Sequence, residues 1–349
     1  MQFKKFPALK GAIFALLAAI LFGASTPFVQ GIGVGIGGWM TAALLYAGAA
    51  TAGFLLRSDQ ATEASLQRQH WPRLFLMALF GAVAGPAALA WGLQHTNGVG
   101  ASLMLTLEAV FTVLLSYLLY REQIGKRVLL AVFLLSAGGA LLVVDQSDTG
   151  TSQMIGLLAV MSATIAWGID NTLSRALADV NPGQVIFGKA VVGASCSLLI
   201  ALALGQTIVS LYAGVGLFLI GGIGYGLSLR FYLLAQREFG SARTGSIFAA
   251  APFIGAAIAF GLGERQTSPL LIGGALLMIA GVVLHLVEEH EHDHEHDYAE
   301  HEHAHTHDDG HHTHTHEVMP RGAHNHRHTH EPLVHRHPHT PDLHHGHGH

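Results

Sequence analysis

A repeated pair of apolar segments constrains this chain more than any other feature of its sequence. The stretch from Gly98 to Val144 contains two apolar runs on either side of a short polar turn. Each run is long enough to cross a hydrocarbon layer about 30 Å thick at about 1.5 Å per residue. The same arrangement returns 142 residues later, so that Gly98 corresponds to Gly240 and Glu122 corresponds to Glu264. The sequence therefore predicts a helical membrane protein built from two related halves.

Composition separates an apolar body from a polar C-terminal segment. Of the 349 residues, 50% are hydrophobic and 12% are charged. Residues 1 to about 287 are almost continuously apolar, whereas residues 288–349 contain 23 of the 26 histidines. A body of this kind is typical of a polytopic membrane protein. The net charge of −5 arises from the acidic tail, and the body shows no basic patch that would bind nucleic acid.

Hydropathy predicts ten membrane-spanning helices. They are expected at roughly 10–30, 37–56, 73–93, 98–120, 127–144, 154–178, 184–205, 212–236, 243–262 and 269–287. If the N-terminus is cytoplasmic, the inside loops hold nearly all of the lysines and arginines of the body, and the outside loops hold Arg265 alone. By the positive-inside rule, both termini are therefore expected in the cytoplasm, and the expected location is a bacterial-type cytoplasmic (inner) membrane.

Five helices in each half give the two halves opposite orientations in the membrane. The expected fold is an all-α polytopic membrane protein with ten transmembrane helices in two inverted five-helix repeats, followed by a disordered C-terminal tail. The expected domains are a first repeat at 1–146, a second repeat at 150–287 and the tail at 288–349. Inverted repeats typically enclose a site near the membrane midplane. Pro27, Pro86 and Pro252 fall inside predicted spans and are expected to kink or break them.

Several local features resemble the EamA family of the drug/metabolite transporter superfamily. Phe22-Gly23 in the first predicted helix is echoed by Trp167-Gly168 in the sixth, and a glutamate closes both the fourth and the ninth. Pro252 matches a proline that the family usually shows, whereas the fourth helix has Val110 at that place. The resemblance covers about residues 10–287. It implies a ten-helix inverted-repeat exporter or permease for small solutes, without naming the solute.

Four ionisable residues lie inside the predicted spans, namely Glu108, Asp170, Lys189 and Arg230. Each costs about 2.5–3.5 kcal/mol near the centre of a membrane helix, so each needs a partner, a wet cavity or a function. Asp170 is expected to pair with Lys189 or Arg230, either as a structural ion pair or as a gate that breaks and re-forms. Glu108 lies deeper and is expected to be a substrate or proton site, or else a protonated carboxyl bonded to a neighbour. Asn171 offers polar lining beside it.

A search for nucleotide-binding and metalloprotease motifs gives no indication that the chain is an enzyme. The nucleotide-binding pattern G-x-x-x-x-G-K-[ST] does not occur, so an ion gradient rather than ATP is expected to drive any transport. The metalloprotease pattern H-E-x-x-H occurs at 290–294 and 301–305, but any alternating histidine tract that contains glutamate produces it. Glu122 and Glu264 lie at helix ends beside arginines, where a solvated interfacial role is expected.

The C-terminal segment alternates histidine with acidic and small residues from His290 onward. Such a segment has almost nothing to bury and is expected to be disordered. Imidazole and carboxylate groups at alternate positions suit Ni²⁺, Zn²⁺ or Co²⁺ without selecting one of them. The candidate metal ligands are His290, His292, His294, His296, His301, His303, His305, His307, His311, His312, His314 and His316.

Three functions remain open at this point. The first is a secondary transporter that moves a small solute or metabolite by alternating access and carries a metal-binding regulatory tail. The second is a divalent metal transporter whose tail is a chelating antenna for Ni, Co or Zn. The third is a metal-storing or metal-sensing membrane protein that transports nothing. The expected partners are the lipid bilayer and a small-molecule or metal-ion substrate, with no required cofactor, no nucleic acid, and a homodimer left open.

Overall fold

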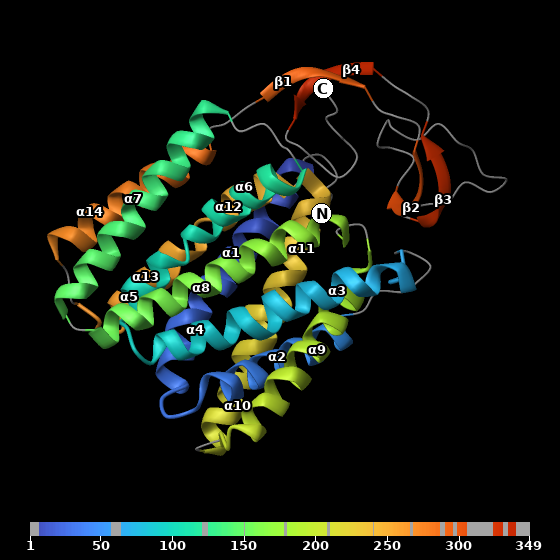
Figure 1. The fold of residues 1–349 in the computed structure, drawn as a ribbon. Helices are drawn as coiled ribbons and strands as arrows, with labels where there is room; N and C mark the ends of the chain where they lie inside the picture. The colour runs from blue at the N-terminus through green and yellow to red at the C-terminus, as the bar shows by residue number, and fades with distance from the viewer. Residues whose placement is uncertain are drawn as a thin grey trace.

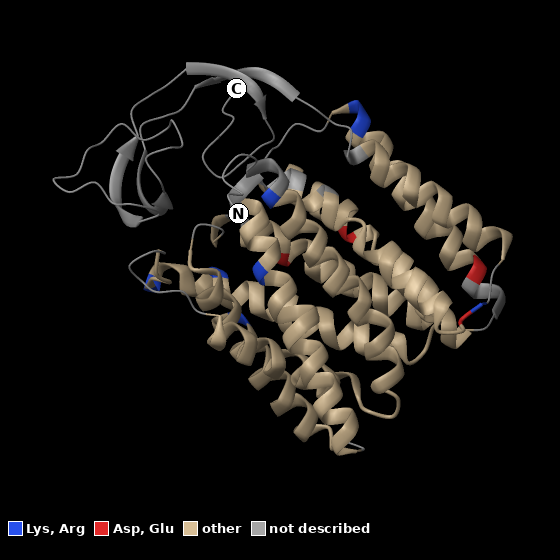
Figure 2. Cartoon of the chain, turned by 180° about the vertical axis from the view of Figure 1, so that it is seen from behind, with Lys and Arg blue, Asp and Glu red and all other residues tan. Residues whose placement is uncertain are grey.

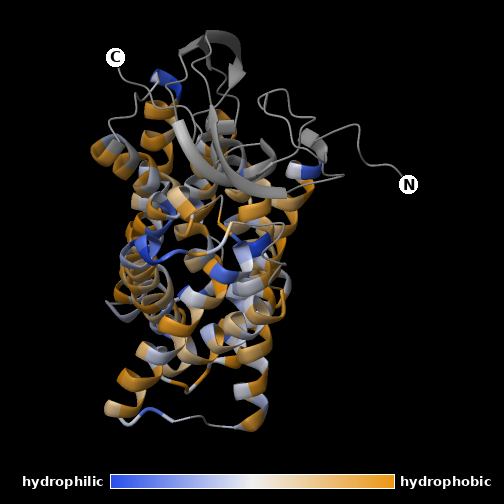
Figure 3. Ribbon diagram, turned by 90° about the vertical axis from the view of Figure 1, so that its right-hand side faces the viewer, coloured by the Kyte–Doolittle hydropathy of each residue, from blue (hydrophilic) through white to orange (hydrophobic). Residues whose placement is uncertain are grey.

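The computed structural model describes most of the apolar body and four short segments of the tail. The described residues are 7–56, 64–120, 125–149, 151–177, 180–207, 210–239, 241–265, 268–286, 290–295, 299–305, 324–330 and 334–339. The described body is almost entirely helical (Figure 1). Apolar residues cover most of the length of these helices, as expected for helices that contact lipid (Figure 3).

The helices fall into two series that follow the two halves of the sequence. The first half contains α1 (Pro7–Ile32), α2 (Gly38–Leu55), the 3₁₀-helix η1 (Arg68–His70), α3 (Trp71–Ala78), the π-helix η2 (Leu79–Ala84), α4 (Gly85–Leu93), α5 (Gly98–Met104), α6 (Leu107–Tyr120) and α7 (Lys126–Thr149). The second half contains α8 (Thr151–Ser174), the 3₁₀-helix η3 (Arg175–Leu177), α9 (Pro182–Ala203), α10 (Leu211–Ile220), the π-helix η4 (Gly221–Leu227), α11 (Ser228–Phe239), α12 (Ser241–Phe248), α13 (Ala251–Gly261) and α14 (Pro269–Leu286).

Eight helical segments of the described chain are long and apolar enough to cross a membrane. They are Lys10–Ile32, Gly38–Leu55, Arg68–Leu93, Gly98–Leu119, Lys126–Asp145, Thr151–Ser174, Pro182–Ala203 and Leu211–Gln236. These segments coincide with the first eight predicted spans, which are therefore confirmed as apolar helices. At the ninth and tenth predicted positions the apolar helices are shorter, at Ala251–Gly261 and Pro269–Leu284.

The fourth and ninth predicted helices are both interrupted. In the fourth position α5 ends at Met104 and α6 begins at Leu107, and in the ninth α12 ends at Phe248 and α13 begins at Ala251. Pro252 lies in the first turn of α13, where its missing N–H costs no helical hydrogen bond, so the break predicted there is confirmed. The fourth helix breaks without a proline, and the sequence analysis did not predict it. By contrast, α1 runs through Pro27 without interruption.

A π-helix occurs at the same place in the third predicted helix of each half. Its first residue is Leu79 in η2 and Gly221 in η4, which are separated by the same 142 residues that relate the two repeats. Pro86 follows η2 directly, in the first turn of α4. Side chains or waters that enter the helical hydrogen-bond ladder accompany such irregular turns, which are frequent at functional sites.

Helices of the two halves pack closely against each other. Helix α2 lies along α9 and η4, and α1 lies along α11 and α13. Glycines allow this approach, because a Cβ added at Gly48 would lie 1.9 Å from the carbonyl oxygen of Phe218. At the edge of the bundle α7 and α14 run side by side (Figure 1).

Charged residues of the described body are unevenly distributed between its two ends. Most lysines and arginines lie toward the end where α7 begins and α14 ends, and only a few charged residues interrupt the uncharged length of the helices (Figure 2). Lys126 and Arg127 at the start of α7 belong to this basic end. The distribution follows the asymmetry of lysine and arginine between the loops that the sequence shows.

The described parts of the tail form paired strands rather than the disordered chain that the sequence analysis expected. Strand β1 (His290–Glu295) pairs with β4 (Val334–His339), and β2 (Ala299–His305) pairs with β3 (His324–His330), both antiparallel. An alternating sequence has the period of an extended strand, and the expectation of disorder did not take this into account. A two-stranded ribbon without an apolar face is only marginally stable in water.

The strand register places histidine opposite histidine. The pairs are His290 with His339, His292 with His337, His294 with His335, His301 with His328, His303 with His326 and His305 with His324. The remaining candidate metal ligands, His296, His307, His311, His312, His314 and His316, lie outside the described residues. Residues directly opposite in an antiparallel pair are close neighbours, so the register brings potential ligand residues together in pairs.

Candidate functional site

Glu108 lies beside the break in the fourth helix and bonds to the other half of the protein. It occupies the first turn of α6, and its side chain is only partly buried. Asn171 of α8 donates a hydrogen bond from Nδ2 to the Glu108 carboxylate oxygen Oε1 over 2.5 Å. Thr112 donates to the backbone carbonyl of Glu108 over 2.9 Å, which is the usual behaviour of threonine inside a helix. The one polar contact of the Glu108 carboxyl that we identify among the described residues therefore joins the two halves.

Asp170 and Lys189 form a buried ion pair within the second half. The Lys189 ammonium of α9 donates a hydrogen bond to Oδ2 of Asp170 on α8, and the two residues are 4% and 5% exposed, respectively. The other carboxylate oxygen of Asp170 has no hydrogen-bond partner in the described structure. Because the pair is buried and Glu108 is not fully so, Glu108 is the more accessible of the two acidic groups.

Gly81 makes room for this ion pair. A Cβ at Gly81 would lie 2.2 Å from Oδ2 of Asp170, so any larger residue would displace the carboxylate. Gly81 belongs to the π-helix η2, and its carbonyl accepts hydrogen bonds from the Tyr46 hydroxyl over 2.5 Å and from Trp167 Nε1 over 3.0 Å. The π-helical turn therefore anchors two aromatic side chains beside the ion pair.

Six aromatic side chains from both halves form a continuous cluster next to these polar groups. They are Phe22, Tyr46, Trp167, Tyr225, Tyr232 and Phe248. Phe22 is central, with ring centroids 5.5 Å from Trp167, 5.6 Å from Tyr225 and 5.5 Å from Phe248. Binding sites for organic molecules are commonly built from such apolar and aromatic walls with a few convergent polar groups.

Arg230 does not join the polar cluster. Its guanidinium donates a hydrogen bond from α11 to the backbone carbonyl of Leu56, the residue that caps the C-terminus of α2. The carbonyls at the end of a helix lack helical partners, and a basic side chain satisfies one of them. Of the two pairings expected for Asp170, the one with Lys189 is therefore confirmed and the one with Arg230 is wrong.

The site contains residues that the sequence analysis did not single out. Tyr46, Gly81 and Phe248 reach it from three separate elements, and only their packing reveals them. Phe22 and Trp167 did carry a signal, because each precedes a glycine in equivalent parts of the two repeats. This aromatic–glycine pattern indicated the repeat, but it did not predict that the two aromatic side chains contact each other.

The polar groups of the described body do not form a metal centre. No group of three or more His, Cys, Asp or Glu residues in that part of the chain comes together as potential metal ligands. Asp170 is already neutralised by Lys189, which leaves Glu108 as the accessible carboxylate. A dehydrated divalent ion usually requires more oxygen or nitrogen ligands than this site offers.

Comparison with known proteins gives consistent matches. The sequence model of the EamA-like transporter family matches residues 9–144 and 154–287. An uncharacterized transporter of Methanothermobacter thermautotrophicus is 32% identical over 234 residues, which cover 64% of this chain and 66% of that protein. The uncharacterized transporter YyaM of Bacillus subtilis is 22% identical over 217 residues, which cover 60% of this chain and 70% of that protein. The chain thus spans about two thirds of the length of these curated relatives.

One solved crystal structure, whose description names no function, has a fold that resembles most of this chain. The TM-score is 0.60 at 18% sequence identity, and the match covers 78% of this chain and 94% of that chain. At this level of identity the likeness concerns the fold alone. The uncovered part of the present chain is of the size of the histidine-rich tail.

Proposed function

Because the chain belongs to the EamA-like transporter family, we propose that it moves a small organic solute across the cytoplasmic membrane by alternating access. The protein is an integral membrane transporter, and eight helices of the described chain are long and apolar enough to span the membrane. The proposed topology has ten spans in two inverted repeats. The equivalent π-helices η2 and η4 and the equivalent breaks in the fourth and ninth helices support it. Family membership favours transport over the alternative of a membrane protein that stores or senses metal and transports nothing.

The hydrogen bond between Glu108 and Asn171 is the observation on which the proposal rests. Interrupted helices place free backbone ends and polar side chains at the substrate sites of many transporters. Glu108 lies at such an interruption, is partly accessible, and bonds across the junction of the two halves. We assign it the role of binding a proton or a polar group of the solute, with Asn171 holding the carboxylate in place.

Alternating access would require the contacts between the halves to change. In this proposal the bond from Asn171 to Glu108 breaks as the second half rocks against the first, which lets a proton or solute replace it. The ion pair of Asp170 with Lys189 lies wholly in the second half and is buried, so we assign it a structural role that moves with that half. An ion gradient would supply the driving force.

The proposed orientation places both termini in the cytoplasm. The basic end of the body, where α7 begins and α14 ends, would then be the inner face (Figure 2). This is the distribution that the positive-inside rule requires. The loops that follow α4 and α13 would face outward.

We propose that the tail binds divalent metal ions and regulates transport. The strand register, which pairs histidine with histidine in both ribbons, supports this, because imidazole is a suitable ligand for Ni²⁺, Zn²⁺ and Co²⁺ and metal binding would stabilise two-stranded ribbons. The second candidate function, metal transport with the tail as an antenna, is favoured by the same register. The described membrane body offers fewer oxygen and nitrogen ligands than a divalent metal ion usually requires, which favours an organic solute as the transported substrate.

Flux through proteoliposomes tests the proposal. A panel of amino acids, nucleosides and small organic amines is compared with Ni²⁺, Co²⁺ and Zn²⁺, using the full-length chain and a chain truncated after Val287. We expect at least one organic solute to be transported by both proteins and to respond to added metal only in the full-length protein. Metal flux that depends on Glu108 and falls on removal of the tail would contradict the proposal and establish the second candidate.

A further inference from the structure

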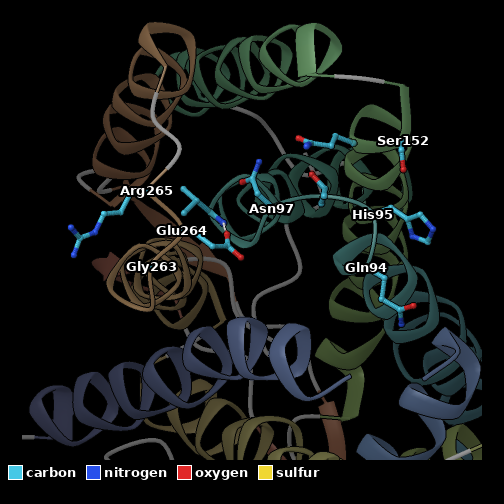
Figure 4. Close-up of a pocket in the computed structure, with 10 residues that line it drawn as sticks. Gln94, His95, Asn97, Ser152, Gly263, Glu264 and Arg265 are labelled. Atoms are coloured by element: carbon cyan, nitrogen blue, oxygen red, sulfur yellow. Dashed lines mark hydrogen bonds between the residues drawn. The ribbon is translucent and has the colours of Figure 1, made fainter. Parts of the chain in front are cut away.

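A polar pocket lies between three loops at the end of the bundle opposite the basic end. Its volume is about 490 Å³, and its lining comes from the loop after α4, the start of α8 and the loop after α13 (Figure 4). The lining residues are Gln94, His95, Thr96, Asn97, Val99, Ser152, Gln153, Gly263, Glu264 and Arg265. Nearly all of them offer hydrogen-bonding groups, so the pocket suits a small polar solute rather than an apolar one.

Glu264 joins one wall of this pocket to the first turn of α5. Its carboxylate oxygen Oε2 accepts hydrogen bonds from the backbone N–H of Gly98 over 2.5 Å and of Val99 over 3.2 Å. Asn97 accepts from the N–H of Gly100 over 2.6 Å, so three unpaired donors at the start of the helix are satisfied. Glu264 is half-buried at this end of the bundle, and its carboxylate also caps α5, a contact that its position in the sequence does not predict.

Gly98 permits this contact at a point where three elements meet. A Cβ at Gly98 would lie 2.2 Å from Oε1 of Gln30 and 3.1 Å from Oε2 of Glu264. Gln30 of α1 also donates a hydrogen bond to the backbone carbonyl of Thr96 over 3.2 Å. The outer end of the bundle is thus closed by α1 and α5 of the first half and the loop after α13 of the second.

Two buried hydroxyls without partners lie along α5 and the loop before it. Thr96 lines the pocket, is 7% exposed, and its hydroxyl has no hydrogen-bond partner in the described structure. Ser102, one turn further along α5, is 0% exposed and equally unpartnered. Buried polar groups are normally bonded, so these two hydroxyls point to partners that another state or a passing solute supplies.

We propose that the pocket is the outer vestibule of the transport path and that Glu264 is the residue that closes it. The carboxylate holds α5 against the loop after α13, and its release frees a route past Thr96 and Ser102 to Glu108 beyond the helix break. Both partners belong to the repeated part of the sequence, where Gly98 corresponds to Gly240 and Glu264 to Glu122. That this route carries a solute rests on the proposed function. The test below measures only access to the route and does not depend on that function.

The test measures access from outside to a cysteine placed at the buried position of Ser102. The reporter Ser102→Cys is made in a chain whose native cysteine is removed by Cys196→Ala, and the full-length protein is reconstituted in proteoliposomes. A membrane-impermeant maleimide is added outside, and its labelling rate is followed. We expect Glu264→Ala to raise the rate about tenfold, since a hydrogen bond to a charged group is lost.

Further variants separate gating from general damage to the protein. Gly98→Ala is expected to raise the labelling rate as well, because its methyl group would lie 2.2 Å from Oε1 of Gln30 and 3.1 Å from Oε2 of Glu264 and so would disturb both contacts that close this end. Glu264→Gln keeps an acceptor oxygen and is expected to give an intermediate rate. Arg265→Ala, on the same pocket wall, and Glu122→Ala, the counterpart in the other repeat, are expected not to raise it. Each variant is first checked for a single symmetric peak in size-exclusion chromatography.

Two outcomes would overturn the assignment. Labelling of Glu264→Ala at the parental rate would show that the carboxylate does not close the route. An equal increase in Arg265→Ala would show that any change in the pocket loosens this end. Labelling requires no transport, so the two proposals can fail separately. Faster labelling of Glu264→Ala without any Glu108-dependent flux would refute the proposed function and leave the gate intact. Glu108-dependent flux with labelling at the parental rate would refute the gate alone.

Discussion

The two halves of this transporter share a backbone plan but differ in their charges. Each half has a π-helix at the same place in its third helix and an interruption in its fourth. The ionisable residues inside the predicted spans do not follow this symmetry: at the offset of 142 residues Glu108 corresponds to Ala250, and Lys189 corresponds to Ala47. The shared backbone can supply two equivalent conformations, whereas the unshared side chains supply the chemistry. Variants that remove or move the unshared side chains therefore test whether transport depends on them or on the shared backbone.

The largest effect is expected from removing Glu108, the carboxylate that lies inside a predicted span of the first half. Glu108→Gln keeps the size of the side chain and a hydrogen bond with Asn171 but can carry neither a charge nor an exchangeable acidic proton. Solute flux in proteoliposomes is expected to fall to the level of liposomes without protein. Moving the carboxylate to the equivalent position, with Glu108→Ala and Ala250→Glu together, is expected not to restore flux. Restored flux would mean that the halves are chemically interchangeable.

The second largest effect concerns the ion pair of the second half. Asp170→Asn leaves the Lys189 ammonium buried without its counter-charge, which is expected to cost about 3–5 kcal/mol and to lower the apparent unfolding temperature in detergent. Adding Lys189→Met should recover most of that loss. Adding Arg230→Met should recover none of it, since Arg230 bonds to Leu56 instead. Equal recovery in both double variants would refute the specific pairing.

A smaller effect is expected where the π-helices of the two halves differ in their surroundings. Gly81→Ala would place a methyl group 2.2 Å from the Asp170 carboxylate and is expected to destabilise the protein by about 1–3 kcal/mol. Gly222→Ala in the other π-helix would meet its nearest neighbour, the carbonyl of Gly48, at 3.4 Å and is expected to be nearly neutral. Thermal unfolding of the two variants compares the segments directly, and equal losses would contradict the distinction.

The smallest effect is expected from one hydroxyl group. Tyr46→Phe removes the hydrogen bond to the Gly81 carbonyl, which still accepts one from Trp167, so a loss of about 1 kcal/mol is expected. Tyr117→Phe on the exposed surface of α6 is the matched control and is expected to change nothing. Both are measured as shifts in apparent unfolding temperature, and a larger shift for Tyr117→Phe would be inconsistent with the assigned contact.

The sequence was a good guide to the repeat and to the spans, because both depend on properties that are local in the chain. Apolar runs identify membrane helices directly, and Pro252 marks a helix break by its chemistry. The break between α5 and α6 contains no proline, so no residue in the sequence predicts it. The sequence gives no indication of the π-helices either, because no residue type marks such a turn.

The sequence reduces the possible partners of each buried charged residue to a few, but it does not show which partner is used. Lys189 and Arg230 lie at similar predicted depths, and only the packing of α8 and α9 on either side of η2 and α3 decides which of them reaches Asp170. Glu264 illustrates the opposite difficulty. A charged residue at the end of a membrane helix usually contacts water, so its bond to the start of α5 could not be expected from position alone. The histidine tail shows that an alternating composition is compatible with paired strands.

The central claim is that Glu108 carries the transport chemistry, and one measurement addresses it most directly. Charge movement is recorded on a solid-supported membrane from proteoliposomes that contain either the native chain or Glu108→Gln, while organic solutes and Ni²⁺, Co²⁺ or Zn²⁺ are applied in turn. The account predicts a transient current with an organic solute in the native protein and no such current in the variant. A current of the same size in the variant would contradict it.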